Sequence, residues 1–502
     1  MHPEKNLKAS TRSRNGLLQF LIENKKRFFE DWVITPLVVA TLLAFVWIMN
    51  TIISMTSLVF PASVACMLLT FIMLILLDWL LPNVAAKIIE ALSPGVQFLL
   101  KWINILFSPA FILIPMSPSI QLSEVGKIAA VFVIGFVISM AFSSILVRVL
   151  QYCNPLRWFY GKSASENQVA EKSHVDNAVH INVLNEKETD WENVEAKSTS
   201  SIGTIIDTNT LTNPTKLVTF LESNVNICIY ALLLVPTAVI YIAIDMSLPI
   251  FLVFNVLCFQ LALLVPPRIR KVLHPILICA ALMILIVYLI SLAKGMSLAE
   301  GLTSYSSGTR FLALSKLGRR ETLPAPGAGD VLYSMLDASI VALSFNMFKF
   351  RKEIREYMFE MLLVIPILSV MTIFLYPIIC RAIGISIEHS LAFAGRSITT
   401  PLAISLITTI GGDVTLGVIL VVLTGISGAL VGNWILSMMR VHDDDYLTIG
   451  VSMGCNSHAI ATDVNPAASA IASASFVLYG SFSVIVSAIP AIISAIRSLI
   501  TN

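Results

Sequence analysis

Arg396 is the one charged residue in the segment SLAFAGRSITTPLAISLITTIGG, which runs from Ser390 to Gly412 and is otherwise small, hydroxylic or apolar. A guanidinium stays protonated in proteins, and a charge at the middle of a membrane costs roughly 2.5 to 3.5 kcal/mol on insertion scales. Its fork of N–H groups suits a carboxylate, and the hydroxyls of Ser397, Thr399 and Thr400 follow directly. These residue types predict a binding site for a small organic anion. The alternative is an arginine that reaches the interface at a helix end, beside threonines that bond to their own backbone.

Gly395 and Pro401 predict a break in the helix that carries this arginine. Glycine loosens a helix, and proline lacks the N–H that would donate to the carbonyl of Ser397. A broken helix at membrane depth is tolerated only where protein or a water-filled cavity surrounds it, and its two ends are dipoles directed at what occupies that space. The break therefore strengthens the prediction of an anion site.

A second polar group lies in the segment CNSHAIATDVNPAA, from Cys455 to Ala468. Asn456, Ser457 and His458 supply an amide, a hydroxyl and an imidazole that could donate to the same anion, and the imidazole could also carry a proton. The alternative is a histidine that only ties two helices together. A hydrolase is disfavoured, because Ser457 and His458 are adjacent and do not face each other on a helix.

Asp337 lies deep in the apolar segment that begins at Gly327. A buried carboxylate there has three interpretations: a countercharge to Arg396, a proton carrier, or a partner for a nearby donor. Asp337 and His458 are the candidates for proton coupling. No metal site is predicted, because the HDDD run at 442–445 is better explained as a solvated turn and helix cap.

Composition decides which elements must position these residues. Of 502 residues, 56% are hydrophobic and 13% are charged, which predicts a polytopic integral membrane protein. Apolar runs predict an all-α fold with roughly ten to twelve transmembrane helices, several of them discontinuous, in two membrane domains. The bilayer is thus one partner, and small-residue faces such as TGISGALVGNW at 424–434 allow close helix packing and a homo-oligomer.

Polarity along the chain predicts four regions. Residues 1–31 form a cytoplasmic N-terminal segment, residues 32–150 a membrane domain of about four helices, residues 151–216 a polar, unstructured cytoplasmic linker, and residues 217–502 a second membrane domain. The first 31 residues contain four acidic groups and no apolar core, so neither a signal peptide nor a plastid leader is expected.

Several classes of protein are disfavoured by the same residues. The net charge of +2 and the scattered basic residues argue against nucleic acid. The seven cysteines form no CxxC pair, so no zinc site or disulfide framework is expected, and nothing points to a cofactor. An enzyme is not expected, since no nucleophile and base are placed within reach of each other.

Several motifs in the second membrane domain resemble those of the LrgB/CidB family. RSITTPLA at 396–403 is similar to the family's (K/R)SVTTPIA hallmark, and the IGG at 410–412 is followed by LTG-x-x-GA-x-x-G-x-W at 423–434. Ser457, His458, Ile460 and Thr462 match a SHGIGTA element. The first membrane domain more loosely resembles the partner LrgA/CidA family, through FPASVACMLLTFIMLILLD at 60–78 and LFSPAFILIP at 106–115.

The resemblance implies transport of small 2-hydroxy or 2-oxo monocarboxylates such as glycolate, glycerate or pyruvate. Our leading hypothesis is a secondary carrier in which Arg396 and its neighbouring hydroxyls hold the substrate at the broken helices. Related bacterial proteins imply a second hypothesis, a holin-like or regulatory membrane assembly. Leakage of a dye without saturable substrate kinetics would favour the second.

Overall fold

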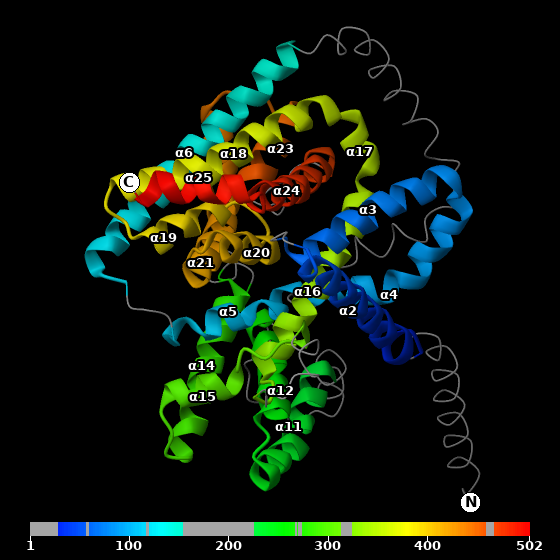
Figure 1. The fold of residues 1–502 in the computed structure, drawn as a ribbon, viewed down its shortest axis with the longest axis vertical. Helices are drawn as coiled ribbons and strands as arrows, with labels where there is room; N and C mark the ends of the chain where they lie inside the picture. The colour runs from blue at the N-terminus through cyan, green and yellow to red at the C-terminus, as the bar shows by residue number, and fades with distance from the viewer. Residues whose placement is uncertain are drawn as a thin grey trace, which may run out of the picture. The chain divides into compact units, whose positions relative to one another are not determined.

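The computed structural model describes residues 29–56, 60–116, 120–153, 225–266, 269, 274–312, 324–457 and 466–501. Helices account for all the regular elements in these residues, and no strand occurs among them (Figure 1). The predicted all-α fold is confirmed. The predicted N-terminal segment and linker lie outside the described residues, apart from 29–31 and 151–153.

Nine helices in the described part of the chain are long and apolar enough to cross a membrane. They are 32–54, 62–80, 82–116, 122–153, 227–244, 275–293, 328–349, 358–382 and 414–438. A pair bent by 82°, Ile471–Ser487 and Pro490–Ile500, raises the number to ten if it forms one broken span. Two apolar helices, Ser247–Leu263 and Thr400–Ile410, are shorter. The chain is therefore an integral, multi-pass membrane protein, as its composition predicted.

Contacts divide the chain into two units, which are considered separately. The first comprises residues 1–107, 310–322 and 331–349. Its described elements are η1 (Glu30–Ile34), α2 (Thr35–Ser54), α3 (Ala62–Leu80), α4 (Pro82–Leu106) and most of α16 (Ala328–Lys349). Helix α2 packs on both α3 and α4. Gly95 of α4 permits this, because a Cβ atom there would lie 2.5 Å from Cβ of Val38 on α2.

The second unit comprises residues 108–309, 323–330 and 350–502. Its earlier elements are α5 (Ser108–Ile112), η2 (Ile114–Met116), α6 (Leu122–Cys153), α11 (Val225–Ile244), α12 (Ser247–Leu263), α14 (Pro275–Ala293) and α15 (Leu298–Tyr305). Its later elements are α17 (Arg351–Glu356), α18 (Met358–Ala382), α19 (Ile387–Ala392), η6 (Phe393–Gly395), α20 (Thr400–Ile410), α21 (Val414–Ser427), η7 (Gly428–Gly432), α22 (Asn433–Met438), α23 (Tyr446–Ser457), α24 (Pro466–Ser487) and α25 (Pro490–Thr501).

Helix α6 packs within the second unit, against α18 and α23 (Figure 1). Its buried face follows the helical period, with Phe132, Phe136 and Met140 each four residues apart. The boundary predicted near residue 150 groups α6 with the preceding helices, whereas packing groups it with the helices that follow. The division of the sequence at residues 32–150 and 217–502 stays a prediction about sequence families.

The glycines of the GISGALVG stretch pack closely, as their spacing predicted. A Cβ atom on Gly428 would lie 2.0 Å from Cβ of Ser457 on α23, and one on Gly432 would lie 2.8 Å from the Met453 side chain. The five residues from Gly428 to Gly432 form a π-helical turn between α21 and α22. These small residues therefore bring this turn against α23.

Candidate functional site

The helix that carries Arg396 is interrupted in the structure. The 3₁₀ turn η6 ends at Gly395, α20 begins at Thr400, and the backbone from Arg396 to Thr399 is not helical. Pro401 lies in the first turn of α20, where backbone N–H groups have no acceptor within the helix, so the N–H that proline lacks costs no hydrogen bond. A Cβ atom on Gly395 would lie 2.7 Å from Cδ1 of Ile407, so this glycine lets the chain before the break approach α20.

The Arg396 side chain is completely buried, with a relative exposure of 0%. Its Nη2 donates to the Tyr376 hydroxyl at 2.5 Å and lies 3.5 Å from the Gly135 carbonyl oxygen. Its Cζ lies 4.3 Å from the centre of the Tyr376 ring, which gives a cation–π contact. The arginine is thus held inside the unit by α18 and α6, and none of it is exposed at the surface of the described residues.

Two nitrogens of this guanidinium remain without a hydrogen-bond partner among the described residues. They are Nε and Nη1, and the neighbouring Ser397 hydroxyl, on a residue 2% exposed, also has none. Buried polar groups are nearly always paired, and an unpaired charged donor is costly. Three polar atoms at one helix break therefore suit an anion with two oxygen atoms, such as a carboxylate.

Tyr376 connects Arg396 to a chain of polar side chains between α6 and α23. Its hydroxyl donates to the Gly135 carbonyl at 2.7 Å and also interacts with the Ser139 hydroxyl. The Ser139 hydroxyl in turn donates to Oδ1 of Asn456 at 2.5 Å. On its other side, Nδ2 of Asn456 donates to the Ser143 hydroxyl at 2.8 Å. This network ties α6, α18 and α23 together beside the arginine.

The other predicted site residues lie in different settings. Thr399 is partly buried at the N-cap position of α20, and Thr400 is buried at the first position of that helix. Asn456 is buried and already bonded, and the Ser457 hydroxyl donates back to the Met453 carbonyl of its own helix at 3.0 Å. His458 lies outside the described residues. The structure thus places Arg396, Ser397, Thr399 and Thr400 together at the break.

Asp337 belongs to the first unit, on α16. Its carboxylate accepts a hydrogen bond from Ser63 on α3 and interacts with the charge of Arg310. The Arg310 guanidinium also lies 4.5 Å from the ring of Tyr333, one turn before Asp337. The role of Asp337 as a proton carrier stays a prediction.

Sequence reasoning missed Gly135, Ser139 and Ser143, which lie on one face of α6. A signal was present, because these three residues recur at intervals of four within GFVISMAFSS, a spacing that lines small residues along one helix face. Tyr376 had no comparable signal, since one tyrosine before a proline in an apolar helix has no distinctive pattern. The contact between Tyr376 and Arg396 depends on how α18 packs against the helix break, which the sequence does not show.

Proteins with similar sequences include a translocator, a holin-like protein and an uncharacterized protein. Over 450 residues, 88% of this chain and 76% of the relative, the sequence is 22% identical to plastidal glycolate/glycerate translocator 1, chloroplastic, of Arabidopsis thaliana. Over 137 residues, 27% of this chain and 58% of the relative, it is 28% identical to holin-like protein CidB of Staphylococcus aureus. An uncharacterized protein of Bacillus subtilis, YwbG, is 26% identical over 134 residues, 59% of its length.

The chain therefore spans less than two thirds of the bacterial relatives that it matches. No solved structure matches it. The resemblance of the first membrane domain to the LrgA/CidA family stays a prediction. Residues 255–493, which include the Arg396 break and Asn456, match the model of the LrgB-like family, and the C-terminal region of this chain is therefore LrgB-like.

Proposed function

We propose that this protein is a secondary transporter of small monocarboxylates, with Arg396 as the group that binds the carboxylate. The observation that carries the proposal is the burial of this guanidinium at a helix break, where Nε and Nη1 have no partner among the residues that the structure describes. A permanent charge without enough hydrogen bonds is stabilised when an anion arrives. An anion held in this way must bind reversibly, which is what a carrier requires.

The surroundings of Arg396 favour a carboxylate of small size. The N–H groups of Nε and Nη1 have no acceptor among the described residues, and charged donors of this kind suit the oxygen atoms of a carboxylate. The Ser397 hydroxyl also has no partner in the described part of the chain, and it would supply a group for a 2-hydroxyl or 2-oxo oxygen. The first turn of α20, from Thr400, presents the positive end of a helix dipole.

We assign a different role to Asn456. Its side chain makes three hydrogen bonds, to Ser139, to Ser143 and to the Ser452 carbonyl. An amide offers about four such bonds, so little capacity remains for a substrate. Asn456 would therefore hold α23 against α6 and keep Tyr376 in place, while Arg396, Ser397, Thr399 and Thr400 contact the anion.

The names of the relatives support the proposal in general terms. One is a translocator of glycolate and glycerate, which are small 2-hydroxy acids, and the others are holin-like or uncharacterized. Neither named kind is an enzyme, and Ser457 does not present its hydroxyl to a base because it bonds within its own helix. Glycolate, glycerate and pyruvate are therefore the substrates to test.

The experiment is uptake of labelled glycolate, glycerate or pyruvate by liposomes that contain the purified chain. Saturable uptake, together with exchange against unlabelled acid inside the vesicles, is the expected result. Arg396→Ala should abolish both, while protein yield and elution from a sizing column stay unchanged. Saturable uptake that survives Arg396→Ala would refute the assignment of the site.

A holin-like assembly is the second candidate, favoured by the relatives named CidB and by the close packing at Gly428 and Gly432. Such an assembly would release a trapped dye regardless of the acid supplied. Dye release without saturable uptake would therefore replace the transporter proposal with this one.

A further inference from the structure

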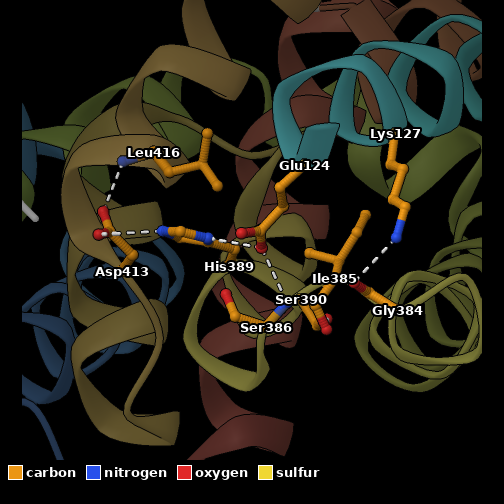
Figure 2. Close-up of polar contacts among 9 residues, drawn as sticks. All are labelled: Glu124, Lys127, Gly384, Ile385, Ser386, His389, Ser390, Asp413 and Leu416. Carbon is orange, nitrogen blue, oxygen red and sulfur yellow. Dashed lines mark hydrogen bonds and ion pairs between the residues drawn. The ribbon is translucent and has the colours of Figure 1, made fainter. Parts of the chain in front are cut away.

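A second cluster of ionisable groups lies in the same unit as Arg396, where α6, α19 and α21 meet. His389 of α19 lies between two carboxylates: its Nδ1 is 2.8 Å from Oε1 of Glu124, and its Nε2 is 3.9 Å from Oδ2 of Asp413 (Figure 2). The three side chains are 11%, 15% and 13% exposed. Both nitrogens of one shielded imidazole thus face negative oxygen atoms.

This arrangement distinguishes the two charge states of the imidazole. A neutral ring has one N–H and can donate to only one carboxylate, whereas an imidazolium has two and can donate to both. In the neutral state, two carboxylates with low exposure would share a single donor, and their repulsion would be stronger than in water. Histidine changes charge within the physiological range of pH, so a proton decides how firmly this cluster is held.

The two carboxylates also fix the backbone around α19. Glu124 accepts a second hydrogen bond at 2.8 Å from the backbone N–H of Ser386, just before α19. Asp413 caps α21, because its Oδ1 accepts from the N–H of Leu416 at 2.7 Å, and its own N–H donates to the Glu388 carbonyl. The cluster therefore joins the start of α6 and the start of α21 to one short helix.

That short helix leads directly to the anion site. Arg396 follows His389 by seven residues, about two helical turns, with η6 between them. Phe393 of η6 stacks on Tyr376 with 6.3 Å between ring centres, and Tyr376 bonds to Arg396. A displacement of α19 would thus be passed to the ring and to the guanidinium.

Helix α6 makes a second connection between the two places. Glu124 lies at its first turn, and Gly135, whose carbonyl accepts from Tyr376, is eleven residues further on. Eleven residues are about three turns, so both positions lie on the same face, roughly 16 Å apart along the axis. The proton-sensitive cluster and the anion site therefore share α6 and the α19 to Arg396 segment.

Other charged groups near the cluster have their own partners. Lys127 of α6 donates to the Gly384 carbonyl, and the Glu388 side chain of α19 is exposed. From α18, Arg381 donates to the Ile500 carbonyl, and from α25, Arg497 donates to the Ile410 carbonyl. The described part of α20 carries no charged residue. Glu124 and Asp413 are thus the groups that face the imidazole directly.

We propose that His389, held between Glu124 and Asp413, binds the proton that travels with the anion bound at Arg396. The inference rests on the proposed function, because it concerns the ion coupled to that transport. A monocarboxylate brings one negative charge, and a proton taken from water onto the imidazole cancels it. On the far side, the proton returns to water when the anion leaves, so one proton crosses the membrane with each anion.

The test compares two kinds of uptake by the full chain in liposomes, with the acid that the wild type exchanges. If one proton enters with each acid, an inward proton gradient of one pH unit can raise the acid concentration inside the vesicles about tenfold over that outside. Exchange against unlabelled acid at equal pH needs no net proton movement. His389→Gln should therefore lose the stimulation by the gradient, to about onefold, while exchange stays within about twofold of wild type. His442→Gln, the same change at an exposed histidine after α22, should keep both.

Asp413→Asn provides a second test that a purely structural role would not satisfy. Asparagine still caps α21, but it removes one of the two charges that favour the imidazolium. The protonated ring then faces one negative partner instead of two, so the pH profile of gradient-driven uptake should differ from that of the wild type. An unchanged pH profile would overturn the inference, and this variant decides the matter alone if His389→Gln does not fold.

The remaining outcomes separate the inference from the proposed function. Wild-type exchange that is saturable but indifferent to a pH gradient overturns the inference and leaves the transporter standing. Loss of exchange and gradient-driven uptake together in folded His389→Gln also overturns it, because the histidine would then be structural. An absence of saturable exchange in the wild type refutes the proposed function itself.

Discussion

Replacement of Arg396 by methionine should make the protein more stable and inactive at the same time. The guanidinium is fully buried, and its Nε and Nη1 carry three N–H groups without an acceptor among the described residues. Exchanging an incompletely paired buried charge for an apolar side chain of similar length is often neutral or stabilising by roughly 1 to 4 kcal/mol. We expect a gain in the free energy of unfolding within that range for Arg396→Met.

The same substitution should eliminate binding of the acid. Removing one member of a buried, hydrogen-bonded charge pair costs about 2 to 5 kcal/mol, which weakens affinity by roughly 30-fold to several thousand-fold. Arg396→Lys keeps the charge but not the fork, and a loss of about 1.5 to 3 kcal/mol corresponds to a roughly 10-fold to 150-fold weaker affinity. The lysine variant should therefore retain weak transport.

Thermal unfolding in detergent, with and without the acid, measures both effects. At about 100 times the dissociation constant, a ligand stabilises the folded state by about 2.7 kcal/mol. The wild type should show this shift and Arg396→Met should not. Arg381→Met, which removes a more exposed cation at the end of α18, should leave the shift intact. A large loss of stability in Arg396→Met would refute the reasoning, because the guanidinium would then be a structural group without need of a ligand.

Four further changes test the packing and the network. Tyr376→Phe removes the hydroxyl that accepts from the Arg396 guanidinium, at a cost of about 1 to 2 kcal/mol in binding free energy. Uptake at limiting acid concentration should fall by roughly 5-fold to 30-fold. Unaltered uptake would contradict a role for this hydrogen bond in binding. Gly454→Ala places a Cβ atom 2.4 Å from a backbone oxygen of α24, so the free energy of unfolding should fall by about 1 to 3 kcal/mol in thermal melts. A Cβ atom on Gly126 would have no atom within 4 Å, so Gly126→Ala should leave the free energy of unfolding equal or raise it by about 0.5 to 1 kcal/mol. Equal losses of stability in both glycine variants would refute the packing argument. Asp330, at the start of α16, accepts from three backbone N–H groups, and Asp330→Ala removes this acceptor. The free energy of unfolding should fall by about 3 kcal/mol or more. An unchanged melting temperature would show that these backbone groups have other support.

Some features of this protein could be predicted because they depend only on residues that are close in the sequence. The helix break could be predicted because Gly395 and Pro401 act on their own backbone within one turn. The energetic cost of Arg396 could be predicted because a charge in an apolar segment is expensive wherever its partners are. Neither argument required knowledge of another helix.

The candidate residues after the break were less predictable. Ser457 has a suitable hydroxyl, but a helical serine can satisfy itself by donating to the carbonyl four residues earlier, and here it does so. Asn456 was predicted to donate to the anion, and its three bonds in the structure go to α6 and to its own helix. Residue type alone could not separate an amide that binds a ligand from one that binds a neighbouring helix.

By itself, the sequence determined an all-α membrane protein, the interruption at Arg396, and the position of one charge in an apolar segment, because hydropathy and backbone chemistry are local properties. Only the tertiary structure decided that Tyr376 and Gly135 hold this arginine, and that Glu124 and Asp413 enclose His389. Gly135 and Arg396 are separated by 261 residues, and Glu124 and His389 by 265. Periodicity shows which face of each helix is buried, but the choice of which faces meet depends on side-chain packing among all the helices together.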